Sequence, residues 1–389
     1  MPTERQIVAA IVAADVGGCW GAVDPSAVVV ESGAELTEWH HVSFLTAPGG
    51  RKLVANVCAW RGATLRNKEA ASRHLAALGL APAVLAELQL EGPSASEPPL
   101  PLHVGEFIEG GILTQEDLSE EAGMTALGSL YARLHAAPTG WFAQVQPALV
   151  AEGVLPAGDE AAAWAGCLWV MPWLQRQVPE ETKASLAAQG VDWGFLEREI
   201  AALPSLDLLP QTPTATVHGD IHEANLVWTS ADKAERQLRM IDFDMTAVGP
   251  AGSDLGFLAL ALFRCAFSLD PALVHSRESQ RQFARAYLRK PGQPQPEDAA
   301  CDELLLLAHL WSYVAMIKIG LICGVLMARP GHAAKRQIMR ARGPVLLHPR
   351  FLEACKGAMR EASAADGPVR QSVLSKGLFF HVDATAWRG

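Results

Sequence analysis

The chain has 389 residues, of which 50% are hydrophobic and 19% charged, so it can bury a large core and is not a disordered chain. Its formal net charge of -10 argues against a nucleic-acid-binding protein, because contacts to phosphates require clustered Lys and Arg. The 7 cysteines form no CxxC pair, which argues against zinc and disulfide frameworks and indicates a reducing, cytoplasmic compartment.

The first hundred residues are predicted to form mainly strands, with one helix. Ala and Leu recur at helical spacing over 67–78, and Gly79 follows as a C-terminal stop. The segment 92–101 is rich in Pro, Ser and Glu, which is typical of an exposed loop between strands. Runs of β-branched and apolar residues predict strands at 26–31, 40–45, 52–60 and 85–90.

Beyond about residue 114 the pattern changes to helices. Leu127, Leu134 and His135 lie on one face of a predicted helix, and helical sequence continues to about residue 203. A short β segment at 215–244 follows, and helices then return. This order predicts a small β-rich lobe at 1–107, a larger α-rich lobe at 108–362 and a loosely packed tail at 363–389.

One segment, 304–328, is almost wholly apolar and nearly long enough to span a bilayer. It contains His309 and Lys318, and a lysine at the centre of a membrane span is energetically expensive. We therefore expect a buried core helix here and no membrane span.

The most informative segment, 217–228, reads Val-His-Gly-Asp-Ile-His-Glu-Ala-Asn-Leu-Val-Trp, and 240–244 reads Met-Ile-Asp-Phe-Asp. Short apolar runs flank the polar stretch 229–237, which predicts a hairpin. Such a hairpin is expected to bring Asn225 and Asp242 close together.

Phosphoryl transfer requires this set of side chains, because the γ-phosphoryl group of ATP carries negative charge that Mg²⁺ must neutralise. Mg²⁺ prefers carboxylate and amide oxygens, which Asp242 and Asn225 can supply. A further carboxylate must orient the acceptor hydroxyl and take its proton, and Asp220 fits that role. Gly219 allows a tight turn, and His218 is expected to brace the loop. The alternative is a loop whose polar side chains only cap local backbone.

These residues resemble the signature of the aminoglycoside phosphotransferase and choline/ethanolamine kinase superfamily. The resemblance extends over about 28–330 and implies an α+β, bilobal protein-kinase-like fold. It also implies an ATP- and Mg²⁺-dependent enzyme that phosphorylates a hydroxyl group of a small molecule. By position, it implies that Asp220 is the catalytic base and that Asn225 and Asp242 are magnesium ligands. It implies a structural brace at Asp254. Asp244 would be a second metal ligand or a substrate contact.

Two further segments resemble the nucleotide-binding parts of that family. The segment 104–110 resembles the hinge, whose backbone near Glu106 and Ile108 would hold adenine. Glu69, followed by 78–82, resembles the family's small-lobe helix. The resemblance implies that this glutamate pairs with the cation that grips the ATP phosphates.

The chain departs from the family where that cation should stand. The third strand has no Lys or Arg at its centre, and Asn56 is the nearest match. Lys52 or Arg51 would replace it only after a shift of register. The phosphate loop at 33–39 also lacks the usual glycine density. These departures favour a second hypothesis, a nucleotide-binding module with little catalysis.

The substrate prediction depends on Trp311, in a segment that resembles part of the choline pocket of choline and ethanolamine kinases. An aromatic face can bind a quaternary ammonium group, which favours an amino alcohol such as choline or ethanolamine. An aminoglycoside or another metabolite is the alternative. Core packing is the other interpretation of Trp311, as it is of Trp164, Trp169 and Trp173, because Trp is usually highly buried. The sequence leaves a homodimer open.

Overall fold

The computed structural model describes residues 3–33, 40–58, 60–91, 97–155, 168, 170–262, 275–327, 333–364 and 367–382. The chain divides into two compact units. Unit 1 comprises Met1–Gly111 and Val227–Asp244, and unit 2 comprises Ile112–Leu226 and Met245–Gly389. Unit 1 holds a five-stranded sheet and unit 2 is mainly helical, which confirms the predicted fold class.

The sheet of unit 1 has the order β1-β2-β3-β5-β4, and its neighbouring strands are antiparallel. The strands are β1 Val29–Ser32, β2 His40–Thr46, β3 Lys52–Cys58, β4 Val84–Leu90 and β5 Leu100–Glu106. Successive side chains along a strand point to opposite faces. Leu53, Ala55 and Val57 therefore share one face of β3, while Asn56 and Cys58 share the other.

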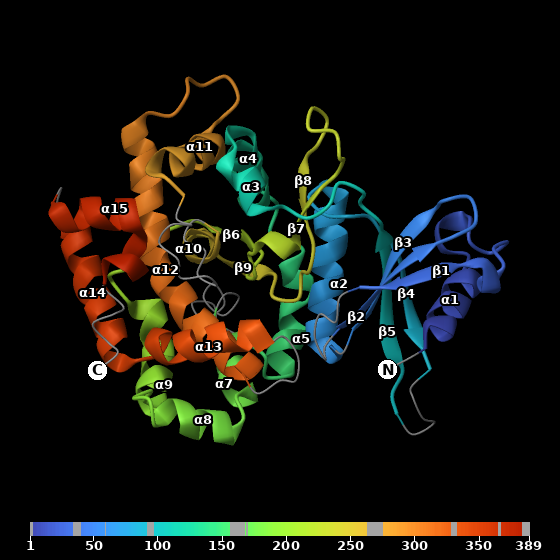
Figure 1. Ribbon diagram of the computed structural model, residues 1–389, viewed down its shortest axis with the longest axis horizontal. Helices are drawn as coiled ribbons and strands as arrows, with labels where there is room; N and C mark the ends of the chain where they lie inside the picture. Colours follow the sequence, from blue (N-terminus) through green and yellow to red (C-terminus); the bar gives the residue numbers. More distant parts are fainter. Residues whose placement is uncertain are drawn as a thin grey trace. The chain divides into compact units, whose positions relative to one another are not determined.

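Two helices cover opposite faces of this sheet (Figure 1). Helix α1 (Glu4–Ala13) packs Ile7 and Ile11 into the apolar core on the face that contains Ala55. Helix α2 (Gly62–Ala77) confirms the helix predicted at 67–78, although it starts five residues earlier and ends one residue earlier. The face of β3 that carries Asn56 thus belongs to the α2 side of the sheet.

Helix α1 is absent from the sequence-based prediction, although its start has a recognisable signal. The hydroxyl of Thr3 accepts a hydrogen bond from the Gln6 amide at 3.3 Å, and the Gln6 side chain accepts from the Thr3 amide at 2.8 Å. This reciprocal pair is a capping box. The apolar residues Ile7 and Ile11 then follow at helical spacing.

The predicted hairpin is present. Strand β7 (Leu226–Trp228) pairs with β8 (Leu238–Met240). The Trp228 amide donates to the Gly111 carbonyl and the Met240 amide to the Leu80 carbonyl, each at 2.8 Å. These bonds attach the hairpin to unit 1, so the small unit contains 227–244 and not only the N-terminal residues.

In the part of unit 2 that the structure describes, helices surround a two-stranded pair, β6 (Thr214–Val217) with β9 (Ala247–Pro250). Its helices are α3 Gln115–Ser119, α4 Glu121–His135, α5 Gln146–Ala151, α7 Val170–Gln177, α8 Glu180–Ala187, α9 Trp193–Ala202, α10 Ala251–Ala261, α11 Arg277–Leu288, α12 Asp298–Met327, α13 Ala333–Leu346, α14 Pro349–Ala364 and α15 Pro368–His381. Helix α4 confirms the helix predicted from the face that carries Leu127 and His135.

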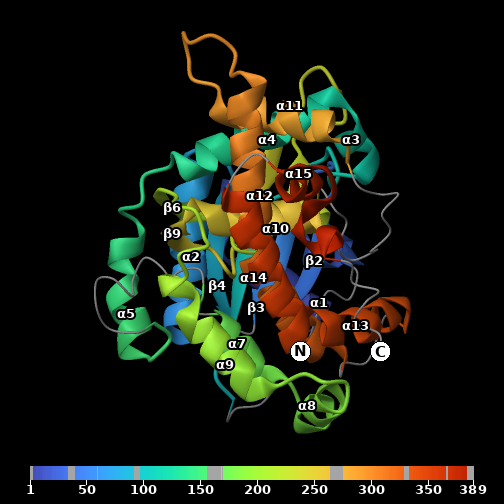
Figure 2. The same cartoon turned by 90° about the vertical axis from the view of Figure 1, so that its left-hand side faces the viewer.

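Helix α12 runs through the middle of unit 2, beside α10 and α14 (Figure 2). By length and composition it could cross a membrane, yet 83% of its most apolar window is buried inside the protein. Gly252 and Gly256 let α10 approach closely, because a Cβ at either position would lie 2.3 Å from an atom of Trp311. The burial agrees with the core helix that we predicted over 304–328.

The C-terminal region differs from the loosely packed tail predicted at 363–389. Helix α15 occupies Pro368–His381 and packs against α12 and α14. Its apolar side chains Val373, Leu374 and Phe379 are buried, and the Phe379 ring lies 5.4 Å from that of Phe351. The tail prediction is therefore wrong over this helix, because these side chains find apolar partners that are distant in sequence.

Candidate active site

The loop after β6 carries the His-Gly-Asp motif and turns sharply at its glycine. Gly219 has a φ of 80°, in the left-handed region that side chains other than glycine rarely adopt. A Cβ at this position would lie 2.4 Å from the carbonyl oxygen of Met245. The turn that presents Asp220 therefore requires glycine for both its backbone conformation and its packing.

Asp254, in the first turn of α10, holds the backbone of this loop. The amide of His218 donates to Oδ2 of Asp254 at 2.7 Å, and the amide of Gly219 donates to Oδ1 at 2.9 Å. The hydroxyl of Thr246 donates to the His218 carbonyl at 3.3 Å. Asp254, the residue predicted as a brace, thus accepts one hydrogen bond at each carboxylate oxygen, from two consecutive amides of the loop.

The carboxylate of Asp254 is completely buried and is supported from α4. Nε2 of His135 lies 3.4 Å from its Oδ2, and Nδ1 of His135 lies 2.8 Å from the Tyr287 hydroxyl. Burial alone would raise the pKa of Asp254, but the His135 contact, His218 and the Gly219 amide together lower it. The sequence analysis placed His135 only on a helix face and missed this contact.

Asp220 stands at the end of the turn with its side chain partly exposed. Its amide donates to Nδ1 of His218 at 3.2 Å, so the predicted bracing by His218 acts on the backbone. No group in the described ranges hydrogen-bonds to the Asp220 carboxylate, and Nε2 of His222 lies 3.9 Å from Oδ2. The carboxylate is thus available to a hydroxyl group.

Asn225 ends the 3-10 turn Glu223–Asn225 that leads into β7, and it is buried. Its Nδ2 donates to the carbonyl oxygen of Asp220 at 2.9 Å. This bond orients the amide, so the side-chain oxygen is the end that can meet a cation. A neutral amide oxygen is a suitable ligand for Mg²⁺.

A buried lysine of α12 also contacts the loop. The ammonium group of Lys318 donates to the carbonyl oxygen of Gly219 and lies 5.4 Å from the centre of the Phe257 ring. The sequence analysis used Lys318 only as an argument against a membrane span. Nothing in its local sequence marks it as a contact of a loop that lies 99 residues away.

Asp242 belongs to unit 1 and lies two residues beyond β8. It has a φ of 65°, which is uncommon for a residue other than glycine. Residues held in such conformations often mark ligand or metal contacts. A carboxylate is the ligand type that Mg²⁺ prefers, so the residue type and the constrained backbone both suit the metal site predicted here.

Both oxygens of Asp244 already have partners in unit 1. Oδ1 lies 2.5 Å from the ammonium nitrogen of Lys68, and Oδ2 accepts a hydrogen bond of 2.5 Å from the indole nitrogen of Trp60. The predicted role as a second metal ligand or substrate contact would have to compete with these contacts. The sequence analysis did not identify Lys68 or Trp60.

Glu69 lies on α2 and faces strand β5. Its Oε1 lies 3.8 Å from Nε2 of His103, the residue that pairs with Asn56 across β3 and β5. Burial and the neighbouring Glu87 raise the pKa of Glu69. Glu69 thus lies beside the imidazole of His103. His103 is the cross-strand neighbour of Asn56, the position at which the resemblance implies a Lys or Arg.

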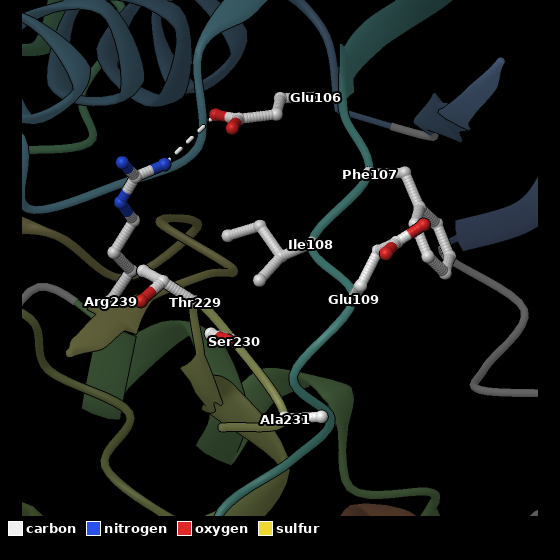
Figure 3. A pocket seen from close by; sticks show the side chains of 8 residues that line it. All are labelled: Glu106, Phe107, Ile108, Glu109, Thr229, Ser230, Ala231 and Arg239. Carbon is white, nitrogen blue, oxygen red and sulfur yellow. Dashed lines mark hydrogen bonds and ion pairs between the residues drawn. The ribbon is translucent and has the colours of Figure 1, made fainter. Parts of the chain in front are cut away.

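The segment predicted as the hinge lines a cavity of about 390 Å³ in unit 1 (Figure 3). The Glu106 carboxylate accepts hydrogen bonds from the Ala83 amide at 3.0 Å and from Arg239 at 2.9 Å. The backbone of Ile108 forms no hydrogen bond with any residue that the structure describes. That backbone is therefore free to bind a planar heterocycle.

The remaining predicted residues fall into two groups. Trp311 is buried, and its indole nitrogen donates to the Pro210 carbonyl at 2.9 Å, which favours core packing over a substrate contact. Most of the phosphate loop predicted at 33–39, and also Trp164 and Trp169, lie outside the described residues.

Comparisons with known proteins bear on the family and on the fold. The profile of the Phosphotransferase enzyme family matches residues 39–304. Viomycin phosphotransferase of Streptomyces vinaceus is 39% identical over 59 residues, which are 15% of this chain and 20% of that protein. The match thus spans a fifth of the length of this relative. The structure of Plasmodium vivax ethanolamine kinase is similar with a TM-score of 0.63 at 14% identity, over 89% of each chain. This likeness confirms the predicted kinase-like fold.

Proposed function

Since the chain belongs to the phosphotransferase enzyme family, we propose that it transfers the γ-phosphoryl group of ATP to a hydroxyl group of a small molecule, with Mg²⁺. The observation that carries this proposal is the braced loop of unit 2. Asp254 binds two consecutive amides of the loop, and the carboxylate of Asp220 is left without a hydrogen-bond partner among the described residues. A fixed loop that presents a free carboxylate is what a hydroxyl acceptor requires.

In the proposed reaction, Asp220 orients the acceptor hydroxyl and takes its proton as the oxygen attacks the phosphorus. Proximity and orientation supply much of the rate in such reactions, so the rigidity of the loop matters as much as the carboxylate. Gly219 and Asp254 supply that rigidity by the geometry described above. Nε2 of His222 lies 3.9 Å from Oδ2 of Asp220 and is thus a neighbour of the same carboxylate.

We propose Asn225 and Asp242 as the protein ligands of Mg²⁺. The side-chain oxygen of Asn225 is the free end of an amide whose nitrogen is bound, and Asp242 supplies a carboxylate from a constrained backbone. Both are hard oxygen donors, as Mg²⁺ requires. When bound, the ion neutralises charge on the phosphate oxygens.

The nucleotide base is proposed to bind the backbone of the segment that follows β5. The unpaired amide and carbonyl of Ile108 support this assignment, because adenine offers one donor and adjacent acceptors along its edge. The carboxylate of Glu106 is occupied by Ala83 and Arg239, so only its backbone is a candidate contact.

The acceptor is proposed to be an amino alcohol or another polar metabolite, with an antibiotic as the second candidate. The fold of the ethanolamine kinase supports the first, and the short match to viomycin phosphotransferase supports the second. The buried position of Trp311 removes the aromatic argument for choline. A nucleotide-binding module with little catalysis is the alternative of another class, which the absence of a β3 cation at Asn56 favours.

The experiment is release of ADP from MgATP across a panel of hydroxyl acceptors, with the Asp220→Asn variant as the matched control. The panel contains ethanolamine, choline, viomycin, aminoglycosides and simple sugars. Acceptor-dependent release that disappears in the variant supports the proposal. Release that is equal in the variant would contradict the role of Asp220. Nucleotide binding without acceptor-dependent release would favour the binding module.

A further inference from the structure

The centre of strand β3 carries no positive charge on its α2 side, where a phosphate-binding strand would need one. Lys52, Val54, Asn56 and Cys58 share this side, and Lys52, the only charged one of the four, stands at the exposed first position of the strand. The side-chain oxygen of Asn56 is buried and has no hydrogen-bond partner among the residues described. An ATP site in unit 1 therefore has to obtain its cation from another position.

The Lys and Arg residues that are nearest to Asn56 in sequence contact other groups. Lys52 lies 3.7 Å from Glu109, with 42% of its own side chain and 73% of the Glu109 side chain exposed. Arg51 donates to the Cys19 carbonyl at 3.2 Å, and Arg61 donates to the Trp60 carbonyl at 2.9 Å. The shift of register that would bring Lys52 or Arg51 inward does not occur, because Asn56 pairs with Val42 on one side and His103 on the other.

Lys68 of α2 instead reaches this place. It lies on the buried face of the helix with Ala71 and Leu75, and only 5% of it is exposed. Its ammonium nitrogen lies 4.0 Å from Sγ of Cys58, on the same side of β3 as Asn56. Glu69, the next residue of the helix, contacts His103 of β5. The side chain that reaches Cys58 is therefore that of Lys68 and not that of Glu69.

One carboxylate contacts this ammonium group. Asp244 lies 2.5 Å from it, and Trp60 holds the other oxygen of the same carboxylate. At this distance, and with Lys68 almost completely buried, the two side chains form a buried ion pair. Lys68 is therefore a charged group with a fixed position beside the loop that contains the proposed magnesium ligand Asp242.

We propose that Lys68 supplies, from α2, the positive charge for the nucleotide phosphates that β3 does not carry at Asn56, and that Asp244 and Trp60 hold it in place. This inference rests on the proposed function. A magnesium ion on Asp242 would carry phosphate oxygens among its other ligands, so a cation held by Asp244, two residues further along the chain, would stand close to those oxygens. The ammonium group has three donors, of which Asp244 and the Cys58 sulfur take two.

The test is the affinity for MgATP, measured by calorimetry on the full chain with Lys68→Met and with Lys376→Met as the control. Loss of a charge-assisted contact should weaken MgATP binding about tenfold to a hundredfold in Lys68→Met. Adenosine, which has no phosphates, should bind both variants as it binds the unaltered protein. Lys376→Met should bind MgATP normally, because this lysine lies on α15 and its side chain is exposed.

Phosphate binding by Lys68 is distinguished from a purely structural ion pair with Asp244 by repeating the substitution in an Asp244→Asn background. This background removes the carboxylate that Lys68→Met would leave buried and unpaired, so the double variant should also fold if the single variant does not. If Lys68 binds phosphates, Lys68→Met still lowers MgATP affinity about tenfold or more there. If it only neutralises Asp244, the effect vanishes in this background and the inference is overturned.

Failure of the inference and failure of the proposed function give different results. If the unaltered protein binds neither MgATP nor MgGTP, the proposed function falls and the inference falls with it. If the unaltered protein binds a nucleotide and Lys68→Met binds it equally well, the inference alone is wrong.

Discussion

The His-Gly-Asp loop of unit 2 and the α2 side of the sheet in unit 1 reach their polar arrangements in different ways. In the loop, His218, Gly219, Asp220 and Asn225 lie within eight residues, and most of the bonds among them are local. On the α2 side of the sheet, the charge comes from Lys68 on a neighbouring helix, and its partner Asp244 lies far along the chain. A local motif can be recognised in the sequence from the spacing of its residues. A charge that a different helix or strand supplies cannot be recognised in this way.

The largest expected effect concerns the loop. Asp220→Asn should lower turnover about 10³-fold or more while MgATP affinity changes little, because the amide cannot take the proton of the acceptor. Turnover and calorimetric binding, measured on the same preparation, check this. Loss of binding together with turnover would mean that Asp220 belongs to the nucleotide site.

Gly219→Ala tests whether the turn itself is required. The φ of 80° and the Met245 carbonyl at 2.4 Å from an added Cβ predict a loss of about 2–4 kcal/mol in the free energy of unfolding. Urea denaturation measures it. The control is Gly292→Ala, where φ is 75° but no atom lies within 4 Å, so only about 1 kcal/mol of backbone strain is expected. Equal losses in both variants would remove the packing argument.

Lys318 is, like Lys68, a buried cation that a distant element supplies, and Lys318→Met tests its contact with the loop. Loss of its hydrogen bond to Gly219 should cost about 1–2 kcal/mol of stability and slow turnover about tenfold, with normal MgATP affinity. The exposed Lys376→Met is the control. A fall in MgATP affinity instead would place Lys318 at the phosphates and weaken the contrast between the two lysines.

The smallest effect is the response of the Asp254 brace to acid. Its pKa lies below the ordinary 3.8, so its contribution to stability is complete above about pH 4 and is lost as the pH falls through the folded-state value. The free energy of unfolding of the unaltered protein should therefore fall more steeply in acid than that of Asp254→Asn. Parallel curves for the two proteins would show that Asp254 is not the titrating group.

The loop, the hairpin, the core helix α12 and the fold class could all be predicted from the amino-acid sequence. Those features depend on short-range patterns: the spacing of Asp220 and Asn225, apolar runs around a polar turn, and the hydrophobicity of 304–328. The burial of Trp311 likewise followed from the usual preference of tryptophan.

Which buried polar groups contact one another depends on the tertiary structure. Lys68 next to Asp244, Lys318 next to Gly219 and His135 next to Asp254 join elements that are distant in sequence. A charged residue on a helix is normally exposed, and it becomes a partner only when another element removes it from water and supplies the opposite charge. No local pattern encodes that meeting, so the three contacts became visible only in the folded chain.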